Sequence, residues 1–159
     1  MKQIKKSIHI AAPAARIYEF VTQPMNMLEI MPSLVEVMNV TRAPDGTHAF
    51  DYVYKMAGIH FRGHAETLKI VQNRRSEVQT KGGIPSTFRW TFDGRNDSTE
   101  VRLEIEYEVP VPLLQKLAEA FLVKINEREA ETLLANLKER LEIAKPLRPE
   151  AAEEEEKRV

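Results

Sequence analysis

The sequence contains no cysteine, and this absence excludes several kinds of site at once. Without thiols the chain has no disulfide framework, no thiol nucleophile, no cysteine-ligated zinc and no iron–sulfur cluster. A chain without cysteine suits a reducing compartment, so we expect a cytoplasmic protein.

The sequence also lacks an excess of one charge and any long apolar run. It has 23 basic and 24 acidic side chains, a formal net charge of -1, so we expect no nucleic-acid partner. No apolar stretch approaches the ~20 residues that span a bilayer. The apolar run after the first basic residues is too short for a secretion signal. We therefore expect neither integral membrane association nor secretion.

Familiar cofactor and metal motifs are missing as well. No GxGxxG, GxxxxGK[ST] or GxSxG pattern occurs, so we expect no dinucleotide, P-loop nucleotide or other cofactor. His60 and His64 have the spacing of two zinc ligands on a helix, but they fall within a predicted strand. Four strand residues span ~13 Å, which is too far for one ion. We expect no metal site.

What is present fits one globular domain. The 159 residues are 43% hydrophobic and 30% charged, and a chain of this length buries a sizeable core. We expect a single ligand-binding domain over residues 1–145. Residues 146–159 form an acidic tail that we expect to be disordered.

Short turn signals divide the middle of the chain into strands. They are Pro44-Asp45-Gly46, Ala57-Gly58, Asn73-Arg74-Arg75, Gly82-Gly83-Ile84-Pro85 and Gly94-Arg95-Asn96-Asp97. Between them, large apolar side chains alternate with polar ones, as in the run from Val101 to Val109. The pattern predicts an antiparallel sheet with one covered face and one solvated face.

Helical patterns flank these strands. Residues 4–10 alternate as a first strand, and two short helical stretches follow, from Ala12-Pro13 to Val21 and over 25–30. A periodic segment runs from Leu113 to about Ile143, which predicts one long C-terminal helix. The fold class is therefore α+β, with two short helices between the first and second strands and a long helix at the end.

The predicted long helix carries apolar residues in four-residue steps. The row is Leu117, Phe121, Ile125, Leu133, Leu137 and Leu141, interrupted by Glu129. Each step overshoots a whole turn by about 40°, so this row predicts an apolar stripe that winds slowly around the helix. A twisted sheet wrapped around the helix would match such a stripe.

The proportions of these elements imply a cavity. Seven strands at ~4.8 Å spacing make a sheet nearly 30 Å wide, whereas one helix is only ~10 to 12 Å across. The sheet must curl around the helix to cover its apolar face. A hollow then remains unless large side chains fill it.

Two segments carry a resemblance to a known family. The opening SIHIAAPAARIYEFVTQPMNMLEIMPSLVEV resembles the start of START-related, Bet v 1-like (SRPBCC) domains. The stretch TFRWTFDGRNDSTEVRLEIEYEVPVPLLQKLAEAFLVKINEREAETLLANLKERLE is similar to the end of the polyketide cyclase/dehydratase and coenzyme-Q-binding branch. The resemblance implies a helix-grip fold, in which a curved seven-stranded antiparallel sheet wraps around the C-terminal helix. Members of this superfamily bind lipids, isoprenoid quinones, sterols or polyketides, and some catalyse cyclisation or dehydration.

The inward-facing aromatic residues and the methionines of the second short helix are the candidate ligand contacts. They are Met27, Met31, Tyr52, Tyr54, Phe61, Phe88, Trp90, Phe92, Tyr107 and Phe121. Methionine adapts to irregular apolar ligands, and the polar tips of buried Tyr and Trp require partners. These residues predict a site for a hydrophobic small molecule.

Catalytic side chains are scarce by comparison. Glu104, Glu106 and Glu108 alternate outward, which leaves Glu129 as the sole candidate acid or base facing the hollow. We assign no catalytic residue. Two alternatives to simple binding remain open: a cyclase or dehydratase on the same scaffold, and a protein-interaction module of the kind associated with chaperones or ribosomes.

Overall fold

The computed structural model describes residues 1–143 as one antiparallel sheet with helices on its concave side. The elements are β1 (Lys2–Ile10), α1 (Ala14–Val21), η1 (Pro24–Asn26), α2 (Met27–Ile30), β2 (Leu34–Arg42), β3 (His48–Met56), β4 (Ile59–Val71), β5 (Arg75–Gly82), β6 (Ser86–Arg95), β7 (Ser98–Tyr107), α3 (Val111–Leu114) and α4 (Glu119–Ile143). The expected domain end at residue 145 and the expected tail at 146–159 lie outside the described residues.

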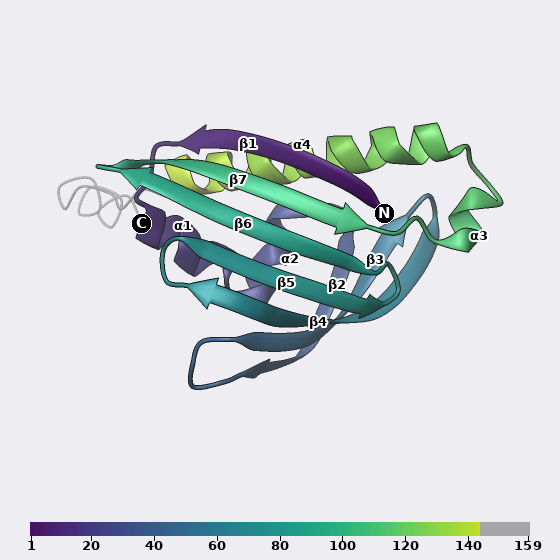
Figure 1. The fold of residues 1–159 in the computed structure, drawn as a ribbon, viewed down its shortest axis with the longest axis horizontal. Helices are drawn as coiled ribbons and strands as arrows, with labels where there is room; N and C mark the ends of the chain where they lie inside the picture. The colour runs from purple at the N-terminus through teal and green to yellow at the C-terminus, as the bar shows by residue number, and fades with distance from the viewer. Residues whose placement is uncertain (144–159) are drawn as a thin grey trace, which may run out of the picture.

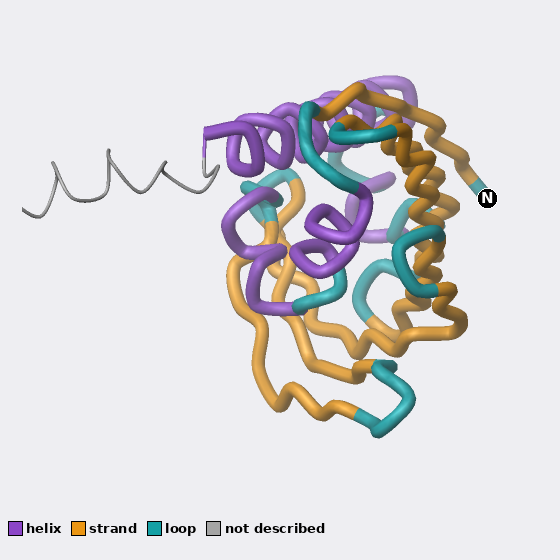
Figure 2. The backbone as a smooth tube through the Cα atoms, turned by 90° about the vertical axis from the view of Figure 1, so that its left-hand side faces the viewer, coloured by secondary structure: helices purple, strands orange, loops and turns teal. Residues whose placement is uncertain are grey.

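The seven strands follow the order β1-β7-β6-β5-β4-β3-β2. Six consecutive strands form a meander, and the N-terminal strand β1 pairs with the last strand β7, from Lys2 opposite Tyr107 to Ile10 opposite Thr99. Figure 1 shows α4 running along β1, and Figure 2 shows the sheet curling around the helices. The predicted helix-grip fold, with two short helices between β1 and β2, is confirmed.

The alternation of apolar and polar residues determines which face of the sheet is covered. Val101, Leu103 and Ile105 on β7 are buried on the concave side. On the other parity, Arg89 of β6 forms an ion pair with Glu106 of β7 at 2.9 Å. The concave face therefore forms the core, and the convex face carries the charges.

Polar contacts hold α4 along β1 over most of the strand. Near the start of the helix, Lys2 forms an ion pair with Glu119 at 2.8 Å. Near its end, the Lys138 ammonium donates to the carbonyl of His9 at 2.7 Å. These contacts place α4 over the β1 side of the concave face and leave the β3 side to be covered by other elements.

The predicted single helix from Leu113 to Ile143 is wrong at its start. The chain forms the four-residue α3, changes direction, and begins α4 only at Glu119. Leu113 is fully buried, so α3 is anchored in the core beyond the end of β7. The chain must turn after this anchor before α4 can lie along β1 (Figure 1).

The predicted apolar stripe is correct only in the second half of α4. Leu133, Leu137 and Leu141 are buried as expected, but the first half buries Leu122, Asn126 and Ala130 instead. Successive four-residue steps accumulate a drift of about 40° each, and a three-residue step corrects it. Leu134 continues the row from Ala130, and the adjacent Leu133 starts the row of Leu137 and Leu141. The three-residue step from Ala130 to Leu133 thus keeps the stripe straight along β1.

Phe121 is therefore not an inward residue. Its side chain is 53% exposed, one residue out of register with the buried Leu122. The prediction that it contacts a ligand is not supported by this position.

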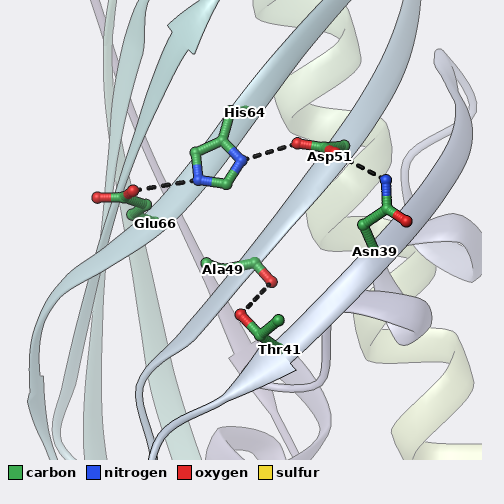
Figure 3. A network of polar contacts seen from close by, with 6 residues as sticks. All are labelled: Asn39, Thr41, Ala49, Asp51, His64 and Glu66. Carbon is green, nitrogen blue, oxygen red and sulfur yellow. Dashed lines mark hydrogen bonds and ion pairs between the residues drawn. The ribbon is translucent and has the colours of Figure 1, made fainter.

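A network of polar side chains lies across β2, β3 and β4 (Figure 3). His64 contacts Asp51 through Nδ1 at 2.8 Å and Glu66 through Nε2 at 3.1 Å. Asn39, whose backbone has a φ of 53° within an irregular stretch of β2, donates to the second oxygen of Asp51 at 2.8 Å. The hydrogen bond to Asp51 raises the pKa of His64, with a smaller contribution from Glu66.

We expect an NMR titration to place the pKa of His64 above its ordinary 6.5. Because the folded pKa is raised, the stabilisation is fully present below about 6.5 and is lost as pH rises through the folded value. Asp51→Asn is expected to lower the His64 pKa more than Glu66→Gln does, since Asp51 makes the larger contribution. Equal titration curves in both variants would contradict the network.

Candidate functional site

A cavity of about 150 Å³ lies between the concave face of the sheet, α4 and the segment formed by η1 and α2. The sheet contributes residues from β1 to β7, and α4 contributes Asn126, Glu129, Ala130 and Leu133. Most of the wall is apolar. The hollow that the proportions of the sheet and helix predict is therefore present.

The sheet register shows why these side chains meet. Ile105, Phe88, Val78 and Thr67 follow one another across β7, β6, β5 and β4 at paired positions. At the start of β3, the His48 amide donates to the Thr67 hydroxyl at 3.0 Å. Paired residues on one face of a sheet point the same way. This row and the neighbouring row of paired residues, from Tyr107 to Phe50, form much of the cavity wall.

Seven of the ten predicted contact residues lie on the wall. They are Met27, Met31, Tyr52, Tyr54, Phe88, Trp90 and Tyr107. Whether each one contacts a ligand stays a prediction.

The other three predicted residues lie elsewhere for identifiable reasons. Phe121 is exposed on α4, as described above. Phe92 is buried under α1, where its ring meets Tyr18 edge-on at 6.0 Å and stacks on Trp90 at 6.2 Å. Phe61 is buried in the core opposite Tyr54, and it is the Tyr54 side chain that lines the cavity. Phe61 and Phe92 therefore belong to the core beside the cavity and not to its wall.

A glycine on the neighbouring strand makes room for Tyr52. Gly63 is paired with Tyr52, and a Cβ placed on Gly63 would lie 2.5 Å from the tyrosine oxygen. A side chain at position 63 would therefore displace the Tyr52 ring. The glycine allows a bulky tyrosine to lie flat against the sheet at the edge of the cavity.

Three buried polar atoms on the wall have no hydrogen-bond partner. Among the described residues these are the His48 Nε2, the Tyr107 hydroxyl and the Asn126 Nδ2, the full set of buried side-chain nitrogen and oxygen atoms that are unpartnered. All three residues line the same cavity. Buried polar groups in proteins are nearly always paired, so three exceptions in one cavity indicate a ligand or water that completes them.

Two of these residues were missed by sequence analysis, although a signal existed for each. His48 has the same strand parity as Phe50, Tyr52 and Tyr54, which marks it as inward. Asn126 lies one residue away from the predicted helix row, on the row that is in fact buried. Tyr107 was predicted.

Burial disfavours the charged forms of two tyrosines and the histidine of the wall. It raises the pKa of Tyr54, and the charge of Glu129 raises it further, against a smaller effect of hydrogen bonding to Ser33. Burial also raises the pKa of Tyr52. Burial lowers the pKa of His48, with a further lowering by Arg42. At neutral pH these two tyrosines are protonated and His48 is neutral.

Three polar contacts attach the segment around α2 to α4. Glu129 accepts a hydrogen bond from the Ser33 amide at 2.9 Å. Asn136 donates to the carbonyl of Ile30 at 3.1 Å, and Arg140 pairs with Glu29 at 2.9 Å. Because a helix of four residues has little stability of its own, these contacts hold it over the cavity.

The comparisons with known proteins agree with this geometry. A family model described as "Polyketide cyclase / dehydrase and lipid transport" matches residues 1–142. No curated protein matches the chain.

Solved structures share the fold at low sequence identity. TTHA0849 from Thermus thermophilus has a TM-score of 0.78 and 20% identity, covering 91% of this chain and 100% of its own. The Zhui aromatase/cyclase from Streptomyces sp. R1128 has a TM-score of 0.73 and 15% identity, and the match covers 89% of this chain and 93% of that one. A START superfamily protein from Mycobacterium smegmatis has a TM-score of 0.71 and 18% identity, and the match covers 90% of this chain and 99% of that one.

Two further findings concern the described residues. Within residues 1–143, no helix has the length and apolarity needed to cross a membrane. In the same range, no group of His, Asp and Glu side chains is arranged to hold a metal ion.

We expect Asn136→Ala to loosen the segment over the cavity. Removal of the Asn136 amide leaves the buried Ile30 carbonyl without a donor, which lowers the free energy of unfolding by about 1–3 kcal/mol. Hydrogen exchange should become faster in residues 27–33. Arg140→Ala is the matched control, since its exposed ion pair is worth less than about 1 kcal/mol. Equal effects of the two variants would show that the segment is not held as described.

Proposed function

The chain belongs to the polyketide cyclase/dehydrase and lipid transport family, and we propose that it binds a hydrophobic small molecule in the cavity under α4. A lipid, an isoprenoid quinone or a polyketide is the class of ligand meant, held for transport or sequestration. The observation that carries the proposal is the apolar cavity lined by three unpartnered polar residues, His48, Tyr107 and Asn126.

The physical basis of binding is burial of apolar surface. Each Å² of apolar surface removed from water contributes ~25 cal/mol, and a few polar groups fix the orientation of the ligand. Residues 1–145 act in this proposal as one binding domain. The lack of cysteine supports a cytoplasmic location.

The size of the cavity implies that its wall moves when a ligand enters. Its volume of about 150 Å³ is below the roughly 300–1,000 Å³ of ordinary ligand pockets. Met27 and Met31 lie on the wall, and unbranched methionine side chains repack easily. The segment of η1 and α2 is therefore the part of the wall that yields to a larger ligand.

A second candidate is a cyclase or dehydratase on the same scaffold. Glu129 favours it, because its carboxylate lies on the wall close enough to raise the pKa of Tyr54. A carboxylate and a phenol side by side can take and return a proton. However, Glu129 already accepts the Ser33 amide, so binding without turnover explains its position equally well.

A third candidate is a protein-interaction module. Val111, Leu114 and Phe121 are exposed apolar side chains on α3 and the start of α4. They lie outside the cavity wall, and exposed apolar side chains away from the cavity are what such a role requires. The first experiment below separates this role from small-molecule binding.

The binding proposal predicts that filling the cavity removes the ligand. Ala130 is buried on the wall, whereas Ala135 is exposed on the same helix. Native mass spectrometry of freshly purified protein should show a bound species of a few hundred daltons in the wild type and in Ala135→Leu. Ala130→Leu should lose it while keeping its thermal stability.

Two outcomes would overturn the proposal. One is an Ala130→Leu protein that retains the bound species. The other is a wild type that carries nothing and shows no thermal shift with lipids and quinones, which would favour the protein-interaction role.

The enzyme alternative is tested with Glu129→Gln, which keeps an oxygen to accept the Ser33 amide. Under the binding proposal its affinity for a neutral ligand changes by less than about threefold, as measured by calorimetry. Incubation with a polyketide-like substrate, followed by product analysis, provides the second measurement. Product formation by the wild type that falls ~100-fold in Glu129→Gln would establish acid–base catalysis.

A further inference from the structure

The three unpartnered polar atoms lie on opposite sides of the cavity. Tyr107 is at the end of β7, and Asn126 is on the facing side of the first half of α4. His48 is at the start of β3. In the sheet order, β7 and β3 are separated by β6, β5 and β4, so four spacings of ~4.8 Å, about 19 Å along the sheet, lie between them.

The curl of the sheet brings these two sides to face each other. Tyr107 pairs with Ser86, Ser86 with Thr80, Thr80 with Ala65, and Ala65 with Phe50. Phe50 is the neighbour of His48 on the same face of β3. Figure 2 shows the strands curling from one side of the molecule to the other, and both ends of this row line one cavity.

Other polar side chains between these ends are already satisfied. The Thr80 hydroxyl donates to the Ile84 carbonyl at 2.8 Å, and the Thr80 and Ser86 hydroxyls contact each other at 2.6 Å. The buried polar atoms without a hydrogen-bond partner therefore lie at the two ends of the cavity.

The wall lacks positive charge. Among residues 1–143, no lysine or arginine lines the cavity, and Glu129 is the one acidic residue that does. A carboxylate or phosphate buried here would have no cation to pair with and would lie in a cavity that holds a glutamate. Burying an unpaired charge is strongly unfavourable.

We propose that the cavity selects an uncharged molecule with a hydrogen-bonding oxygen at each of two ends, one bound by Tyr107 and Asn126 and the other by His48. The inference rests on the proposed binding function and specifies its ligand class. Hydroxyl ends suit both sites, because a hydroxyl donates and accepts, as do the Tyr107 hydroxyl and a neutral imidazole. The class excludes free fatty acids and other anions.

The test uses straight-chain probes that differ only at their ends. Diols from hexanediol to dodecanediol are compared with the monoalcohols and the carboxylates of equal length, by calorimetry with the full chain at neutral pH. At one length, the diol should bind about fivefold to tenfold more tightly than the monoalcohol. The carboxylate should bind at least about tenfold more weakly than the monoalcohol.

Variants of His48 identify the second end of the site. His48→Leu should remove the preference for the diol, so that the diol and the monoalcohol of equal length bind this variant with affinities within about twofold of each other. His48→Gln, which keeps a polar side chain, should retain part of the preference. A thermal melt of each variant checks folding, and no loss of stability is expected from the removal of His48 Nε2, which has no partner.

The outcomes separate this inference from the proposed function. Binding of monoalcohol and diol with a ratio that His48→Leu does not change would overturn the two-ended site and leave the binding function intact. Carboxylates that bind as well as alcohols would overturn the selection against charge. Failure of every probe to bind would count against the proposed function itself, and this inference would fall with it.

Discussion

One constraint shapes the molecule: a single helix is too narrow to cover a seven-stranded sheet. A flat sheet of this size would be nearly 30 Å wide, and a helix covers ~10 to 12 Å of it. Contacts such as Lys2 with Glu119 hold α4 over the β1 edge, so the rest of the concave face must be covered by the curl of the sheet and by α1, η1 and α2. The cavity lies between α4, the curled part of the sheet and the segment of η1 and α2.

The same constraint explains the polar residues found in otherwise apolar surroundings. A four-residue helix cannot hold its position over a hollow by packing alone, because part of its inner face contacts empty space. Glu129 and Asn136 on α4 supply directional bonds to Ser33 and Ile30 instead. The acid that interrupts the apolar row of the helix is thus part of the attachment of the cavity cover, and any ligand that displaces the cover must break these bonds.

The sequence was sufficient to predict what depends on local periodicity. Strand alternation placed Tyr52, Tyr54, Phe88, Trp90 and Tyr107 on the inner face, and all five line the cavity. The predicted apolar row of the helix was wrong at Phe121, because residues four apart rotate slowly around the helix axis. Only the strand against which the helix packs determines where a three-residue step restores the buried face. The contact between Ser33 and Glu129 joins residues 96 positions apart, and no local pattern reveals such a pairing. Asn126 was missed for the first reason and the role of Glu129 for the second.

The unpartnered residues also bear on why the cavity exists. A buried donor or acceptor without a partner costs about 1–3 kcal/mol, and small domains have only ~5–15 kcal/mol of stability in total. Phenylalanine at position 107 and leucine at positions 48 and 126 would avoid this cost. A ligand that forms hydrogen bonds with these atoms removes this cost when it binds. The free energy recovered in this way contributes to the affinity for the ligand and stabilises the folded chain. Each of three features is unfavourable for a purely structural domain: buried polar atoms without partners, an unfilled volume, and a segment of η1 and α2 held by few bonds. Together they are what a binding cavity requires.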